Sequence, residues 1–208
     1  YPEFEDNALL RRLIARRCIY GVDINEVAVQ LARLAIWVHT FVPGLPLSLL
    51  DRNLVHGNSL IGVGLLIEIE DKVREEGLAL FQVKAADLIG DASAALKRLG
   101  QLADATPEEL KEARQAWVDA DKATSPARAM CDILTAARIE GIDIPLNFTR
   151  WEKWKHQVVG GKEHVHAMQV LQGVNQLHFP VVFPEVFLRD RSGFDVMLGN
   201  PPWEEARV

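Results

Sequence analysis

The sequence predicts an α/β fold in which a parallel sheet is covered by helices and interrupted by a large α-helical insertion. Two short apolar runs, 18–22 and 194–198, suit buried strands, whereas the chain between about 66 and 176 is dominated by helical patterns. We therefore divide the chain into a partial core over residues 1–64, a helical insertion over 65–178 and a return to the core over 179–208.

The composition indicates a globular protein in a reducing, cytoplasmic setting. The chain is 49% hydrophobic, and its apolar stretches are interrupted before they reach the roughly 20 residues of a membrane span. Cys18 and Cys131 lie in no metal-ligand or redox pair, so we expect both to be buried. The net charge of -6 excludes bulk electrostatic coating of nucleic acid, so any such contact must be local.

The first predicted unit is a strand, a turn and a helix. The strand occupies residues 17–23 and ends in Asp23, after which Asn25 can cap a helix that continues to Pro43-Gly44. Apolar residues recur at helical spacing, so we expect this helix to be largely buried. A second short strand is predicted over 54–56, leading into Gly57-Asn58-Ser59-Leu60. The predicted helix face consists of Val27, Ala28, Leu31, Ala32, Ala35 and Val38.

Two helix starts are predicted within the insertion. Thr106-Pro107-Glu108-Glu109 has the capping Thr, first-turn Pro and third-position Glu of a capping box. Ser125-Pro126 is interpreted as the start of the next helix, with Gly141 as its stop.

The end of the chain is expected to return to the sheet. Pro180 and Pro184 make residues 179–188 an edge strand or a packed loop, because proline cannot donate to a strand ladder. Residues 193–199 are predicted to form a buried parallel strand. The segment 200–203 then follows its carboxyl end, where open α/β sheets bind ligands.

Asn200-Pro201-Pro202-Trp203 carries groups that suit methyl transfer to an exocyclic amine such as that of adenine. The lone pair of such an amine is delocalised, so hydrogen-bond acceptors must be aimed at both N–H groups. The Asn200 side-chain oxygen and the Pro201 carbonyl can accept these two hydrogen bonds. Pro202 stiffens the turn, and Trp203 can stack on the base. The alternative is a simple strand-terminating turn, which Asn-Pro dipeptides commonly begin.

Four segments follow one another along the chain in a recognisable order: Ile19–Asn25, Ala28–Ala32, Gly57–Leu60 and Phe194–Trp203. Together they resemble the large N6-adenine DNA methyltransferases of restriction-modification and phage-exclusion (BREX-like) systems. The resemblance implies a partial Rossmann-like (class I) methyltransferase core that uses S-adenosylmethionine and acts on double-stranded DNA with a flipped-out adenine.

The resemblance also implies individual roles. Asp23 corresponds to the acidic residue that holds the cofactor ribose hydroxyls, and Ile24 would flank the cofactor adenine. Asn58 corresponds to the polar residue that contacts the edge of that adenine. The segment 200–203 would bind the target base.

Two parts of such an enzyme are not found in the sequence. The glycine-rich cofactor loop would precede Tyr1, and the target-recognition region would follow Val208. We therefore expect this chain to be a piece of a longer protein that binds little or no cofactor alone.

A basic, aromatic-rich stretch at 150–156 is a second candidate for DNA contact. Lys153 and Lys155 could touch the DNA backbone, or the stretch could be a surface anchored by its tryptophans. His164 and His166 have no evident third ligand, so no metal site is expected.

Two other functions stay open. A protein-glutamine N5-methyltransferase faces the same delocalised lone pair and can use a similar Asn-Pro-Pro loop. Alternatively, the helices over 66–176 could form a non-catalytic interaction module for which the sheet is only a scaffold.

Overall fold

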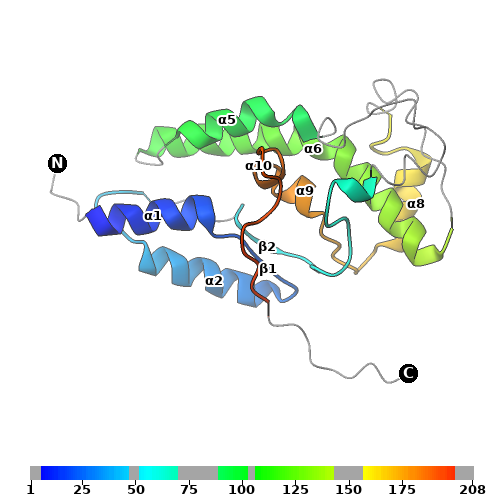
Figure 1. Ribbon diagram of the computed structural model, residues 1–208, viewed down its shortest axis with the longest axis horizontal. Helices are drawn as coiled ribbons and strands as arrows, with labels where there is room; N and C mark the ends of the chain where they lie inside the picture. The colour runs from blue at the N-terminus through cyan, green and yellow to red at the C-terminus, as the bar shows by residue number, and fades with distance from the viewer. Residues whose placement is uncertain (1–5, 47–51, 70–88, 103–105, 143–156, 200–208) are drawn as a thin grey trace, which may run out of the picture.

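The computed structural model describes residues 6–46, 52–69, 89–102, 106–142 and 157–199 (Figure 1). Most of the described elements are helices, and two short strands lie between them. In chain order the elements are α1 (Asp6–Cys18), β1 (Gly21–Asp23), α2 (Glu26–His39), β2 (Leu54–His56), α5 (Ser93–Gln101), α6 (Pro107–Glu140), α8 (Lys162–Val170), α9 (Phe179–Val182) and α10 (Pro184–Phe187).

The strand expected over 54–56 is confirmed, and the strand expected over 17–23 is confirmed only for Gly21–Asp23, because residues 17 and 18 belong to the end of α1. The two strands pair in parallel, with Val22 opposite Val55 and Asp23 opposite His56. Within the described ranges the sheet has two strands, so the larger parallel core remains a prediction. In Figure 1 the strands lie between α2 on one side and α9 and α10 on the other.

Helix α2 begins as expected but is far less buried than expected. The Asn25 side chain caps it by accepting from the amides of Val27 and Ala28, at 2.9 and 3.3 Å. The helix ends at His39, with Thr40 as its cap, rather than at Pro43-Gly44. The expectation of burial is wrong, because α2 packs on two narrow strands that cannot cover its whole apolar face. The side chains left 55–71% exposed are Val27, Leu31, Leu34 and Val38.

Helix α6 confirms one predicted start and the predicted stop. Thr106 caps it by accepting from the Glu109 amide at 3.1 Å, and Gly141 ends it in the left-handed conformation. The second predicted start is wrong, because one helix of 34 residues runs through Pro126. Proline leaves the carbonyl four residues earlier without its donor. The Ser125 hydroxyl supplies a substitute by donating to the Lys122 carbonyl at 2.9 Å.

The main core lies between α6 and the short helices α9 and α10. Phe183 and Met130 are fully buried there, and Val22 and Val55 pack against the same cluster from the sheet. The expected edge strand or loop over 179–188 is wrong. Pro180 and Pro184 instead occupy the first turns of α9 and α10, where a missing amide costs little.

The expected buried strand over 193–199 is also wrong. Phe194 is anchored among Tyr20, Phe179, Phe183 and Phe187, with ring centroids 5.5–6.2 Å apart. Beyond it, Val196 to Leu198 are 73–95% exposed. No described strand pairs with this run, so its backbone has no ladder to join.

The two cysteines differ in exposure. Cys131 is buried as expected, but Cys18 is exposed. None of the helices in the described ranges is both long enough and apolar enough to cross a membrane.

We predict that Pro126→Ala raises the free energy of unfolding by about 1–2 kcal/mol, because it restores a helix hydrogen bond and removes the ring clash. Ser125→Ala alone should lower it by about 1 kcal/mol, because the Lys122 carbonyl then loses its donor. Urea denaturation of the single and double variants forms the test. In the Pro126→Ala background Ser125→Ala should have little effect; an equal cost in both backgrounds would contradict this account.

Candidate functional site

The parallel pairing brings two predicted cofactor residues to one edge of the sheet. Asp23 ends β1, and Asn58 follows the end of β2 by two residues. The ladder continues past the strands, because the Gly57 amide donates to the Asp23 carbonyl at 3.0 Å. Carboxyl ends of parallel strands are where α/β sheets bind ligands.

Among the described residues, one carboxylate oxygen of Asp23 is engaged and the other is not. Its Oδ1 accepts from the Asn25 amide at 2.7 Å, which closes the turn into α2. Within the part of the chain that the structure describes, Oδ2 has no hydrogen-bond partner, and the residue is exposed. This oxygen can therefore accept from a hydroxyl of a bound ligand.

Ile24 presents an apolar side chain to solvent beside that carboxylate. Its side chain is 62% exposed. Its backbone carbonyl accepts from the His56 imidazole, with Nε2 and the oxygen 2.9 Å apart. From the sequence His56 was expected only to be a strand residue, although its position directly before Gly57-Asn58, in a strand parallel to β1, places it beside Asp23.

Asn58 lies in a segment that is held by a distant part of the chain. Its side-chain oxygen accepts from the Leu60 backbone amide at 3.0 Å, and its backbone amide donates to the Asn175 carbonyl at 2.6 Å. Gly62 allows the two segments to approach closely. It has φ +140°, and a Cβ there would lie 2.0 Å from the Leu177 carbonyl oxygen.

A buried polar network anchors the same segment to α6. His178 Nδ1 accepts from the Val63 amide at 3.0 Å, so the opposite nitrogen, Nε2, carries hydrogen and donates to Asp132 Oδ1, also at 3.0 Å. Gln176 donates to the same oxygen at 2.6 Å. Burial acts to raise the pKa of Asp132, but the hydrogen bonds from His178 and Gln176 outweigh it and hold the pKa below its ordinary value.

The remaining predicted site residues cannot be placed. Asn200, Pro201, Pro202 and Trp203 lie outside the described residues, and so do Lys153 and Lys155. Their roles stay predictions from the sequence.

The two histidines of α8 have separate partners. His166 Nε2 lies 3.0 Å from Glu140 Oε2. His164 Nδ1 accepts from the Gly160 amide, and His164 Nε2 lies 3.6 Å from Asp132 Oδ2. Across the described ranges, no group of three or more His, Cys, Asp or Glu residues could hold a metal ion.

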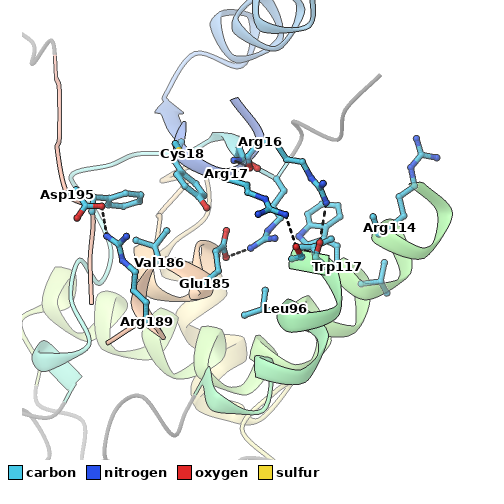
Figure 2. A pocket seen from close by; sticks show the side chains of 18 of the residues that line it. Arg16, Arg17, Cys18, Leu96, Arg114, Trp117, Glu185, Val186, Arg189 and Asp195 are labelled. Carbon is cyan, nitrogen blue, oxygen red and sulfur yellow. Dashed lines mark hydrogen bonds and ion pairs between the residues drawn. The ribbon is translucent and has the colours of Figure 1, made fainter. Parts of the chain in front are cut away.

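A cavity of about 820 Å³ opens at the other edge of the sheet, beside the residues that precede β1 and β2 (Figure 2). Arg16 and Arg17 line it and donate to carbonyls at the end of α5, including Gly100 at 2.8 Å. Arg52 and Glu185 form an ion pair within it. Neither Asp23 nor Asn58 lines this cavity, so it is separate from the predicted cofactor residues.

Comparison of the chain with known proteins identifies its family. Residues 17–207 match the family described as Eco57I restriction-modification methylase. The chain belongs to this family. Membership in this Eco57I methylase family implies methyltransferase activity in general. Methylases of this kind typically use S-adenosylmethionine. No curated protein and no solved structure matches it.

We predict that Asp132→Asn lowers the free energy of unfolding by about 1–3 kcal/mol at pH 7, because a charged acceptor of two hydrogen bonds becomes neutral. The pKa of Asp132 is lowered in the folded chain, so its stabilisation is present above the unfolded pKa of about 3.9 and lost as pH falls through the lower folded value.

Urea denaturation of both forms at pH 7, 5 and 3.5 measures this effect. The difference between wild type and Asp132→Asn should shrink towards the lowest pH. A difference that is the same at all three pH values would show that the charge of Asp132 does not contribute.

Proposed function

We propose that this Eco57I-family methylase transfers a methyl group from S-adenosylmethionine to N6 of adenine in DNA, as part of a restriction-modification or phage-exclusion system. The observation that carries the proposal is that Asp23 and Asn58 lie at the same carboxyl edge of two parallel strands, in a family methylase that also contains Asn200-Pro201-Pro202-Trp203.

The described residues fit a nucleoside at this edge. A ribose presents neighbouring hydroxyls, and Asp23 offers Oδ2 as an acceptor that no described residue engages. The exposed Ile24 side chain offers an apolar surface for the flat face of adenine. Asn58 lies on the adjacent strand end, where its amide nitrogen can meet the edge of the base.

The target amine is assigned to Asn200 and its neighbours. S-adenosylmethionine supplies the methyl group as an electrophile on its sulfonium. The Asn200 side-chain oxygen and the Pro201 carbonyl accept hydrogen bonds from the two amino N–H groups of adenine and stabilise the positive charge that develops on nitrogen. Trp203 stacks on the extruded base, which replaces the stacking lost from the duplex.

DNA contact in this proposal is local rather than spread over the chain. The net charge of -6 leaves little general attraction for phosphate. Lys153 and Lys155 are the proposed backbone contacts, and their effect on binding should weaken as salt is raised. Family membership favours DNA over a protein-glutamine substrate, which shares the need for two acceptors.

The proposal predicts that Asn200→Ala abolishes methyl transfer, with a rate loss of about 100-fold or more from the missing acceptor. The assay is transfer of labelled methyl groups to DNA by the full-length gene product, with adenine N6 identified by nucleoside analysis. Asn7→Ala, an exposed asparagine in α1, is the matched control and should retain activity. Transfer to a glutamine amide instead of DNA, or full activity of Asn200→Ala, would reject the assignment.

Asp23→Asn tests the cofactor residue separately. The substitution keeps an oxygen for the Asn25 amide but removes the charge, so we expect binding of S-adenosylhomocysteine to weaken about tenfold. Calorimetry on the full-length gene product measures the Kd, and exposed Asp190→Asn is the control. Equal affinities of wild type and Asp23→Asn would remove Asp23 from the site.

A further inference from the structure

The imidazole of His56 connects the ends of the two strands. In the parallel register His56 lies opposite Asp23, and its Nε2 lies 2.9 Å from the Ile24 carbonyl oxygen, one residue further along. A carbonyl can only accept, so Nε2 must carry hydrogen and donate. The side chain therefore reaches across from β2 to the turn that follows β1.

Two successive carbonyls of that turn are thus held from β2. The Gly57 amide holds the Asp23 carbonyl at 3.0 Å, and His56 holds the Ile24 carbonyl. The Asp23 carboxylate closes the turn on the other side by accepting from Asn25. These contacts fix the peptide planes before and after Ile24, and with them the directions of both the carboxylate and the apolar side chain.

Packing cannot replace the His56 contact. Ile24 is 62% exposed, so its side chain has little apolar contact that would hold the backbone in place. His56 is itself exposed and does not belong to the buried clusters. Its removal should therefore loosen the turn while leaving the folded core intact.

We propose that His56 is a positioning residue for nucleoside binding: through the Ile24 carbonyl it pre-sets Asp23 and Ile24 in the geometry that takes the cofactor. The inference rests on the proposed function and adds a residue to its site. Pre-organisation of this kind lowers the ordering cost of binding, so its loss acts on affinity rather than on the chemical step.

The test compares His56→Leu, His56→Gln and His39→Leu in the full-length gene product. Leu removes the donor, whereas Gln places an amide N–H near the position of Nε2. His39 is an exposed histidine in the last turn of α2 and serves as the control. We expect the Kd for S-adenosylhomocysteine and the KM for S-adenosylmethionine to rise about fivefold in His56→Leu, with kcat unchanged.

His56→Gln should recover most of the affinity, and His39→Leu should match wild type. Unchanged affinity in His56→Leu, or a fall in kcat with KM unchanged, would overturn the positioning role while leaving the proposed function intact. Absence of cofactor binding by the wild-type gene product would instead overturn the proposed cofactor site.

A readout without ligand tests the geometry itself. The ¹⁵N chemical shifts of the His56 ring should show hydrogen on Nε2. A ring with hydrogen on Nδ1 alone could not donate to Ile24, and that result would also overturn the inference.

Discussion

Two buried hydrogen bonds of His178, one to Asp132 and one from the Val63 amide, join three segments that are far apart in the sequence. Asp132 belongs to the long helix α6, and His178 precedes α9 and accepts from the Val63 amide. The segment that carries Asn58 is thereby fastened to the helical part of the molecule. A carboxylate in such surroundings is costly unless its hydrogen bonds are satisfied, and here His178 and Gln176 both donate to it.

Features set by a few neighbouring residues were predictable from the sequence. Asn25, Thr106 and Gly141 act at helix ends through hydrogen bonds or backbone conformations within a few residues. Features set by distant partners were not. The exposure of α2 and of residues 195–199 depends on which strands are present to cover them. The helix through Pro126 is a local exception, because the neighbouring Ser125 hydroxyl donates to the carbonyl that lacks an amide donor.

The candidate site divides in the same way. Asp23 and Asn58 could be assigned to one edge because residues that follow parallel strands must meet there. The role of His56 could not be predicted from the sequence, because it depends on a hydrogen bond from the His56 side chain across the strand pair to the Ile24 carbonyl. No pattern of residue types indicates such a contact. The partners of the Asn58 segment, Gln176 and His178, are more than a hundred residues away along the chain, so local sequence patterns could not predict them.

The continuity of α6 limits how the length of this chain can vary. Ala113 and Ala116 contact α5 near one end of the helix, and Asp132 joins its network nearer the other. Each residue turns a helix by about 100°, so one residue inserted between these points would rotate the carboxylate away from its donors. An insertion of about seven residues, close to two full turns, would keep the two faces aligned. Insertions and deletions of other sizes should therefore accumulate in the connections that flank α6.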